Sequence, residues 1–384
     1  MDRDHLLVPE ACYLIDVGGT STRVARCRAA GGRLAPAETR VYESRAYPSL
    51  EAILRDDAAR TGFSGKSAVI GVPGPVVDGA ARATNLPWVI DAAGLQRALG
   101  LSGVRLLNDV EALGHAIAGL GPGDIEVIHP GRPRAGYPAA LIAPGTGLGE
   151  AFVTPEGDAC RVWPSEGGHA DFAPATALEV RILAHLRNRW DRVSCERVCS
   201  GPGIYTLYRF LKEEGICPEP AWLRKRLAAA HDPVEAIARN ALSGGEAADI
   251  TVRTIELFLS ILGAEAGNMA LRFNARAGVY IGGGVALKIL PLANKKGMAA
   301  AFHNKGRLSA VVSEIPLMLI RKANANLYGL AEYARNWRMP ERTADGENFE
   351  RLDTCSSGRG SSSPQPRGDS KGDQNAVRQK RTNP

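Results

Sequence analysis

The feature that most constrains the fold is an apolar segment that runs directly into two glycines. Residues 14–24 read LIDVGGTSTRV, and the turn consists of Asp16, Val17, Gly18, Gly19 and Thr20. Successive glycines adopt dihedrals that a Cβ forbids, and they let backbone N–H groups approach a ligand closely. The turn matches neither G-x-G-x-x-G nor G-x-x-x-x-G-K-[ST], and the residues after it favour a strand over a helix. We therefore predict a hairpin that binds phosphate, with an ordinary Gly-Gly hairpin as the alternative.

The same plan recurs later in the chain. Residues 141–153 (LIAPGTGLGEAFV) place Gly145, Thr146, Gly147 and Gly149 between two apolar segments. Residues 278–287 (GVYIGGGVAL) place Gly282, Gly283 and Gly284 after another. Such self-similarity indicates a duplicated architecture. Two turns that face each other would offer glycine amides and threonine hydroxyls to one polyphosphate.

Length and composition narrow the class of protein. The chain has 384 residues with 45% hydrophobic content, enough for two domains with sizeable cores. We find no segment of roughly 20 apolar residues and no secretory signal at the N-terminus. Seven scattered cysteines argue against a disulfide framework and for a reducing compartment. We expect a cytoplasmic protein with no membrane partner.

The net charge of +6 is concentrated near the C-terminus. Residues 354–384 carry six basic and two acidic residues, a local charge of +4, which leaves +2 for the rest of the chain. This segment is rich in Ser, Gly, Pro and Gln and has few apolar residues, so it cannot bury enough surface to fold. We predict a disordered tail at 340–384 and no nucleic-acid partner.

Strand-like and helix-like segments alternate along the body of the chain. Residues 68–72 and 104–107 are typical of buried strands, and residues 112–120 of a helix that ends before Gly121 and Pro122. Alternation of this kind predicts an α/β fold with parallel sheets packed by helices.

The domain boundary is predicted where the first run of strands and helices ends. Helical spacing dominates much of the second half of the chain. We predict a small α/β domain over 1–119, to which a helix at about 322–339 returns, and a large α/β domain over 120–321.

Asn108 and Asp109 interrupt apolar surroundings at the end of the strand 104–107. In open α/β sheets, ligands bind at the carboxyl ends of the strands. An aspartate between a strand and a helix is also a good N-cap, which would give Asp109 a structural role alone.

Three further polar side chains adjoin glycine turns: Glu166 and His169 in PSEGGHADFAP, and Glu196 in CERVCSGPG. Glu166 and His169 have the spacing of half a metal site, but the two glycines between them argue against the helix that such a site uses. A carboxylate can instead accept two hydroxyl hydrogen bonds from one sugar ring.

The ordered set of motifs resembles the bacterial glucokinases of the hexokinase and actin-like ATPase superfamily, in the branch without a zinc-binding cysteine cluster. The motifs are DVGGT at 16–20, TNLPW at 84–88, LLNDVEA at 106–112, PGTGLG at 144–149, EGGHADFAP at 166–174, ERVCSGPG at 196–203 and IGGGV at 281–285. The resemblance implies a two-domain actin-like ATPase fold, ribonuclease H-like and duplicated, with the ligand cleft between the domains.

The resemblance also implies an activity and its residues. The activity is ATP-dependent phosphorylation of the 6-hydroxyl of glucose, giving glucose 6-phosphate and ADP, with Asp109 as the general base. The implied sugar ligands are Asn108, Glu166, His169, Glu196 and, at the side of the sugar, Asn85.

The phosphates of ATP are assigned by the same resemblance to the turns Asp16–Thr20 and Gly145–Gly149, and the adenosine to Gly282–Gly284. Asp16 would help to place Mg²⁺, held largely through water. Two positions depart from the family pattern: Ser21 stands where an asparagine is common, and Glu150 where an apolar residue is common. Glu150 would repel phosphate if it pointed toward it, and the sequence leaves its direction open.

Two alternatives remain from the sequence. A kinase for another hexose would share every motif. A non-catalytic sugar sensor would carry a DNA-binding helix-turn-helix ahead of this fold, and only about a dozen residues precede the first predicted strand. Because members of the family are often dimers, we expect a homodimer.

Overall fold

Two mixed β-sheets carry the glycine turns in the computed structural model, which describes residues 12–30, 33–83, 85–157, 159–243 and 247–337. Both sheets belong to one compact unit of the chain, Met1–Met339. The predicted disordered tail at 340–384 lies outside the described residues. The predicted domain division at 119/120 stays a prediction.

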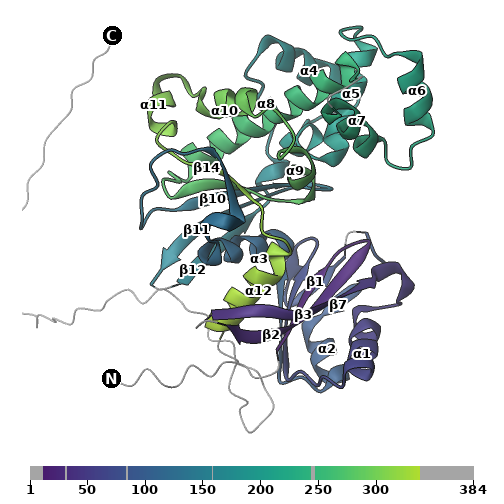
Figure 1. Cartoon of the computed structure of the whole chain (residues 1–384), viewed down its shortest axis with the longest axis vertical. Helices are drawn as coiled ribbons and strands as arrows, with labels where there is room; N and C mark the ends of the chain where they lie inside the picture. The colour runs from purple at the N-terminus through teal and green to yellow at the C-terminus, as the bar shows by residue number, and fades with distance from the viewer. Residues whose placement is uncertain (1–11, 31–32, 84, 158, 244–246, 338–384) are drawn as a thin grey trace, which may run out of the picture. The chain divides into compact units, whose positions relative to one another are not determined.

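The first sheet is built from the N-terminal third of the chain (Figure 1). Its strands, in spatial order, are β3 (Arg33–Glu43), β2 (Ser21–Ala30), β1 (Cys12–Val17), β4 (Ser67–Val72) and β8 (Gly103–Asn108). A small antiparallel sheet follows β4 in the sequence and consists of β5 (Val76–Val77), β6 (Ala80–Arg82) and β7 (Val89–Asp91).

The second sheet repeats the central part of the first. Its strands, in spatial order, are β12 (Ala159–Ser165), β11 (Leu148–Glu156), β10 (Ala139–Pro144), β13 (Gly278–Ile281), β14 (Leu317–Ile320) and β9 (Ile125–His129). In each sheet a glycine turn joins two antiparallel strands, β1 to β2 and β10 to β11, as predicted. The strands after them in each sheet are parallel, β1 to β4 to β8 and β10 to β13 to β14.

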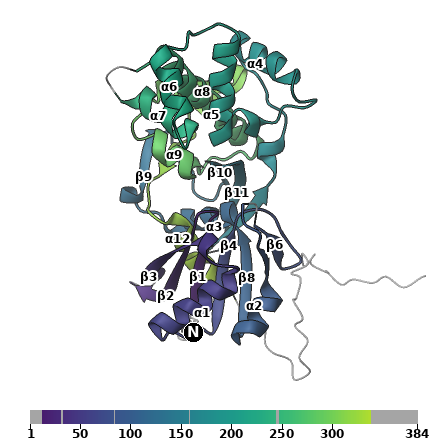
Figure 2. The same ribbon diagram turned by 90° about the vertical axis from the view of Figure 1, so that its right-hand side faces the viewer.

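Helices cover both sheets. The helices near the first sheet are α1 (Leu50–Thr61), α2 (Ala92–Leu99), α3 (Asp109–Ala116) and α12 (Ala325–Asn336). Those that gather on one side of the second sheet in both views (Figure 2) are α4 (Ala177–Arg187), α5 (Gly201–Glu213), α6 (Ala221–Ala228), α7 (Pro233–Leu242), α8 (Asp249–Arg272), α9 (Gly284–Ile289), α10 (Lys296–His303) and α11 (Ser309–Val312).

Alternation along β1 decides what each of its side chains meets. Successive strand residues point to opposite faces of a sheet. Tyr13 and Ile15 pack into the core beneath α1 and α2, whereas Cys12 and Leu14 pack against α12. Asp16 has the same parity as Leu14, so its side chain points toward α12, the helix drawn in yellow-green in Figure 1.

The helix α3 packs against both sheets. Ala112 belongs to the core between the first sheet and α12, and Leu113 and Ala116 belong to the core on one face of the second sheet. The opposite face of the second sheet packs against α5 and α8. A residue at the start of α3 therefore lies close to turns of both sheets.

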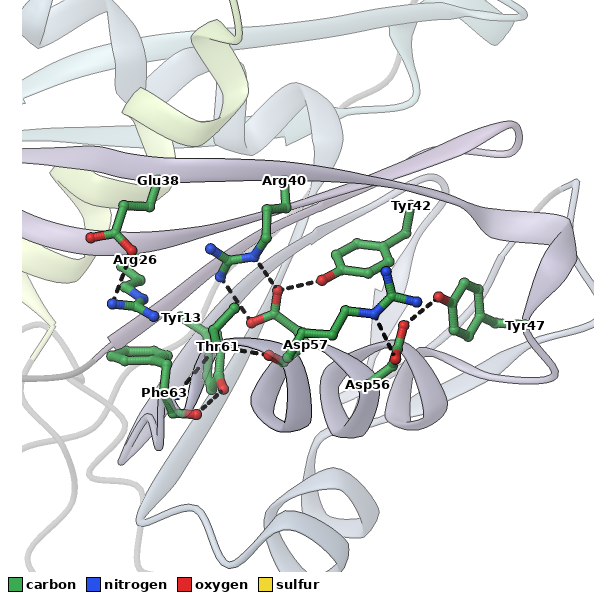
Figure 3. Close-up of polar contacts among 11 residues, drawn as sticks. Tyr13, Arg26, Glu38, Arg40, Tyr42, Tyr47, Asp56, Asp57, Thr61 and Phe63 are labelled. Atoms are coloured by element: carbon green, nitrogen blue, oxygen red, sulfur yellow. Dashed lines mark hydrogen bonds and ion pairs between the residues drawn. The ribbon is translucent and has the colours of Figure 1, made fainter.

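A buried carboxylate attaches α1 to the edge of the first sheet (Figure 3). Asp57 on α1 has no exposed side-chain surface, and it accepts hydrogen bonds from Arg40 Nε at 2.6 Å and Arg40 Nη2 at 3.0 Å. Tyr42 Oη donates a third at 2.6 Å. The contact to Asp57 and burial raise the pKa of Tyr42 to about 12, so this hydroxyl stays a donor at neutral pH. Both donors lie on β3. Residues 40 and 42 are two positions apart, so their side chains point to the same face of that strand and can both reach Asp57.

Candidate functional site

The first glycine turn is a tight hairpin that leaves little room for side chains. The Gly18 N–H donates to Ser21 O at 3.1 Å, and Ser44 Oγ donates to Gly18 O at 2.7 Å. A Cβ on Gly18 would lie 2.7 Å from Ser21 O, and one on Gly19 would lie 2.9 Å from Asn85 Cβ. Asn85, which was predicted to lie at the side of the sugar, thus packs directly against this turn. Ser21, where the family pattern has asparagine, closes the turn with its backbone carbonyl.

Asp16 faces partners that the sequence did not identify. Asn326 Nδ2 on α12 donates to Asp16 Oδ1 at 3.1 Å, and Arg23 Nη1 lies 3.5 Å from Asp16 Oδ2. Burial raises the pKa of Asp16, and both partners act in the opposite direction. Asn326 was missed because it lies 310 positions from Asp16. Its only signal was a polar residue near the start of a predicted helix.

Asn108, and not Asp109, is the N-cap of α3. Asn108 Oδ1 accepts from the Val110 N–H at 2.9 Å and from the Glu111 N–H at 3.4 Å. The Glu111 carboxylate in turn accepts from the Asn108 N–H at 3.4 Å, and the two bonds between Asn108 and Glu111 form a capping box. The predicted helix start at residue 112 is therefore wrong by one turn, because the box includes the polar residues ahead of the apolar run. The interpretation of Asp109 as a cap is also wrong.

Asp109 is the first residue of α3 and is partly buried. Burial raises the pKa of its carboxyl to about 6, and the negative charge of Asp16 acts in the same direction. The Val110 N–H, which donates to Asp109 Oδ1 at 2.9 Å, lowers the pKa in part. Asp109 therefore changes from acid to base close to neutral pH, and its charge interacts with Asp16 at the first glycine turn.

The second glycine turn is in contact with α5 and with Glu196. Gly145 O accepts from the Gly201 N–H at 2.8 Å, at the start of α5. Glu196, on the short helix η5 (Cys195–Arg197), accepts from the Leu148 N–H at 3.0 Å. A Cβ on Gly147 would lie 2.6 Å from Glu196 Oε2, so a side chain here would displace the Glu196 carboxylate. The third cluster lies alongside: a Cβ on Gly283, at φ +82°, would meet Pro144 O at 2.5 Å.

The loop with Glu166 and His169 forms the short helix η4 (Gly167–His169) at the end of β12. The two side chains are exposed, by 76% and 58%, and His169 Nε2 lies 3.9 Å from Glu166 Oε2. The loop backbone packs on β11, where a Cβ on Gly168 would overlap Leu148 O. Three groups of predicted residues thus meet around Leu148. They are the loop Glu166 to His169, Glu196 and the second glycine turn.

The helix α3 connects the two groups of predicted residues. A Cβ on Gly149 would overlap Val110 on α3, and a Cβ on Gly282 would lie 2.5 Å from Leu113 Cδ2. Both glycines are therefore needed for α3 to pack beneath the second turn and the third glycine cluster. This packing holds Asp109 at the side of β11 that Gly149 faces.

Glu150 points away from α3, into the core of the second sheet. Along β11, Gly149 and Ala151 face α3, so Glu150 faces α8 on the opposite side. Its side chain is buried, and burial together with the charge of Glu265 raises its pKa to about 7. The sequence left the direction of the Glu150 side chain open, and in the structure this side chain points into the core.

A cavity of about 740 Å³ extends from the second turn along α7 and α9. Its lining includes Gly145, Thr146, Gly201, Val285 and Lys288. A second cavity of about 530 Å³ also contains Thr146 and has Glu196 in its wall. A volume in this range fits a nucleotide-sized ligand. The lining from α7 and α9 was not predicted, since helix residues outside any recognised motif carry no local sign of a ligand.

In the described ranges, no three His, Cys, Asp or Glu side chains come together as a metal-binding group. None of the helices described is both long and apolar enough to cross a membrane. Six cysteines of the described part of the chain are free thiols.

A family model for glucokinase matches residues 14–337, which includes both sheets and α12. The chain belongs to the glucokinase family. The enzyme class predicted from the motifs is confirmed by this match, and the mixed α/β sugar-kinase fold is confirmed by the solved structures below.

Relatives and solved structures agree with the family model. The glucokinase of Nostoc punctiforme is 35% identical over 330 residues, covering 82% of this chain and 96% of the relative. That of Chromobacterium violaceum is 37% identical over 336 residues, covering 87% and 92%. A crystal structure of glucokinase from an Antarctic psychrotroph aligns with a TM-score of 0.74 at 27% identity, covering 85% of this chain and 99% of the other. A ROK family glucokinase from Streptomyces griseus, solved with glucose and AMPPNP, shares the fold, with a TM-score of 0.57 at 20% identity and coverage of 85% and 99%.

Proposed function

We propose that this chain transfers the γ-phosphoryl group of ATP to the 6-hydroxyl of glucose, with Asp109 as the general base. Membership of the glucokinase family supports the reaction. The single observation that supports the base is that Asp109 stands at the start of α3, does not cap that helix, and has a pKa of about 6. A general base works best when its pKa lies near the working pH.

The chemical step that we propose moves one proton and one phosphoryl group. The glucose O6 attacks the γ-phosphorus, the bond from that phosphorus to the bridging oxygen breaks, and ADP leaves. The O6 proton passes to the Asp109 carboxylate. Most of the acceleration in phosphoryl transfer comes from positioning and electrostatic stabilisation, which the glycine amides of the turns would supply.

For the sugar we propose Glu166, His169, Glu196, Asn108 and, at the edge, Asn85. The exposure of Glu166 and His169 supports this, because both can accept a ligand without losing an internal partner. Asn108 Oδ1 caps α3 and Asn108 Nδ2 donates to Gly74 O at 2.9 Å. The second N–H of that amide would donate to a sugar hydroxyl.

For ATP we propose the cavity along α7 and α9, with the phosphates between the turns at Asp16–Thr20 and Gly145–Gly149. Thr146 lines this cavity, which supports a path from the adenosine to the second turn. Gly282–Gly284 would border the adenosine through Val285, which follows them into the lining. The complex of the Streptomyces griseus neighbour with AMPPNP is consistent with a nucleotide at this fold.

For Mg²⁺ we propose Asp16 as the contact, largely through water. The charge of Asp16 raises the pKa of the Asp109 carboxyl, and a hard divalent cation near Asp16 would relieve this repulsion. When bound, Mg²⁺ would neutralise charge on the phosphates. Asn326 would orient the Asp16 carboxylate toward the turn.

We also propose a cytoplasmic homodimer. The six free thiols support a reducing compartment. Sedimentation at micromolar protein tests the dimer, and a monomer there would remove it. A panel of glucose, mannose, fructose and N-acetylated sugars tests the alternative of another hexose.

The experiment that tests the base is Asp109→Asn. Asparagine keeps the size and hydrogen bonding of the side chain but accepts no proton. We expect kcat to fall by about 10²- to 10⁴-fold while the glucose Kd changes little, measured by coupled assay and calorimetry on one preparation. In the wild type, kcat/KM should rise with pH through about 6.

Asp91→Asn is the matched control. Asp91 is a true N-cap, of α2, and accepts from the Gly94 N–H at 2.7 Å. Asparagine is an equally good cap, so activity and melting temperature should stay at the wild-type level. A fully active Asp109→Asn enzyme would refute the proposed base. A folded wild type that does not turn over glucose would instead favour the sensor.

A further inference from the structure

Glu150 is a buried carboxyl beneath the loop that carries Glu166 and His169. Its side chain is 2% exposed, and Glu150 Oε1 has no hydrogen-bond partner in the described part of the chain. Leaving a charged carboxylate unpaired in a protein interior is costly, whereas a protonated carboxyl costs far less. The mechanism proposed above makes no use of this group.

The carboxyl is in direct contact with the loop backbone. A Cβ on Gly167 would overlap Glu150 Oε2, and it would lie 3.0 Å from Ser165 Oγ. The Gly167 N–H donates to Ser165 Oγ at 3.1 Å, and residue 150 pairs with residue 165 across β11 and β12. The carboxyl group of Glu150 therefore packs directly beneath Gly167. This glycine lies in the sequence between Glu166 and His169.

The charged groups that face Glu150 come from two other elements. On α8, Glu265 raises the pKa of Glu150 and Arg272 lowers it. Arg272 Nη1 is already bound to Glu265 Oε1 at 2.6 Å, and Asn268 Nδ2 donates to Glu265 Oε2 at 2.9 Å. From η5, the Cys195 thiol has a pKa raised well above the usual value by its contact with Cys199 and by burial, and the charges of Glu265 and Glu150 act in the same direction.

The other neighbours carry no charge toward Glu150. Across the sheet it pairs with Ile142 on β10 and Ser165 on β12. The two titratable groups of the loop itself, Glu166 and His169, are exposed. An ionised Glu150 would thus meet a like charge at Glu265, while the loop above it is held by the bond from the Gly167 N–H to Ser165 Oγ.

We infer that Glu150 is a positioning residue for the sugar site, whose protonated carboxyl supports Gly167 and whose ionisation displaces the loop and weakens glucose binding. This inference rests on the proposed function, because the loop is proposed to hold the sugar. It predicts an alkaline limb in KM for glucose that is separate from the acid limb of kcat, which belongs to Asp109.

The test measures KM for glucose, glucose Kd and kcat between pH 5.5 and 9 in the wild type and in Glu150→Gln. Since the Glu150 pKa is about 7, the wild-type KM should rise by up to about tenfold from pH 6 to pH 8 if only the protonated form binds well. Glutamine is neutral and of the same size, so its KM should stay low and flat. The pH profile of kcat should be the same in both.

Glu156→Gln is the matched control, because Glu156 lies on the same strand and is exposed. Its KM profile should follow the wild type. Glu265→Gln is a second variant that leaves Glu150 in place. It removes the like charge and frees Arg272, so the rise in KM should begin at lower pH.

The outcomes separate this inference from the proposed function. A flat Glu150→Gln profile, or a downward shift in Glu265→Gln, supports the positioning role. An active enzyme whose Glu150→Gln profile matches the wild type overturns it and leaves the proposed function standing. If thermal melting shows that Glu150→Gln is unfolded, the Glu265→Gln profile decides. Absence of glucose phosphorylation in the wild type at every pH refutes the proposed function itself.

Discussion

Two carboxylates are buried against the two sheets, Asp57 on α1 and Glu150 on the inner strand β11, and their surroundings differ. Asp57 receives three hydrogen bonds, two from the Arg40 guanidinium and one from the Tyr42 hydroxyl. Glu150 faces Glu265, and one of its oxygens has no partner in the described residues. Burial is therefore compatible with a permanent charge only in the first case, where donors surround the group.

The two carboxylates also differ in their position relative to the candidate site. Asp57 joins α1 to β3, and its partners are confined to the first sheet (Figure 3). Glu150 touches the loop between Glu166 and His169. A fully paired carboxylate gives a rigid attachment, whereas an under-paired one near neutral pKa can respond to pH. The following predictions test whether these two acids really belong to different classes.

The largest effect is expected from Asp57→Ala, on the free energy of unfolding. Removing one partner of a buried ion pair leaves the other charge unpaired, which costs about 3–5 kcal/mol. We expect the lower end, about 3 kcal/mol in the free energy of unfolding, because Arg40 keeps partial contact with water. Urea denaturation followed by circular dichroism measures it. The KM for glucose of the folded fraction should be unchanged, and a large rise in KM would mean that the first sheet controls the sugar site.

The next effect is a pH-dependent gain in stability in Glu150→Gln. The folded-state pKa of Glu150, about 7, is raised above its ordinary value, so the native state binds this proton more tightly than the unfolded state does. The wild type therefore loses stability as pH rises toward 7, and the glutamine variant does not.

We expect Glu150→Gln to be more stable than the wild type by on the order of 1–3 kcal/mol at pH 8, and the difference to shrink toward pH 5. Melting temperatures across that range measure it. The raised pKa of Asp109 is common to both proteins and cancels in the difference. A difference that stays constant with pH would place Glu150 in the same class as Asp57.

The smallest effect is expected from Asp56→Asn, which tests whether burial is what makes Asp57 important for stability. Asp56 is the neighbour of Asp57, but it is solvated and pairs with Arg60 and Tyr47 on the surface (Figure 3). Asp56→Asn should leave the melting temperature within experimental error, because exposed ion pairs contribute little. If Asp56→Asn and Asp57→Ala were equally destabilising, burial would not be what distinguishes the two acids.

Local sequence signals predicted the two hairpins and several of the other elements. The double glycines at 18–19 and the glycines at 145–149 end strands and reverse the chain, and both hairpins are present. The strand predicted at 68–72 is β4, and the helix predicted at about 322–339 is α12. These features depend on neighbours a few positions apart, which is why a sequence shows them.

The same signals failed where two local interpretations competed. At Asn108 and Asp109, both residue types are good caps, and the capping box formed with Asn108. The helix consequently began one turn before the apolar run that predicted it. Nothing local distinguishes the two choices, because they differ only in which side chain turns back onto the helix.

The sequence by itself determined the family, the positions of the turns and the residue types available for chemistry, since these follow from motif order and local backbone preference. The tertiary structure alone decided which groups meet. Asn326 reaches Asp16 across 310 positions, and Glu196 reaches the Leu148 N–H across 48. It also decided that Glu150 points inward, because strand alternation gives a side chain two possible faces, and only the helix packed on each face settles what that side chain will meet.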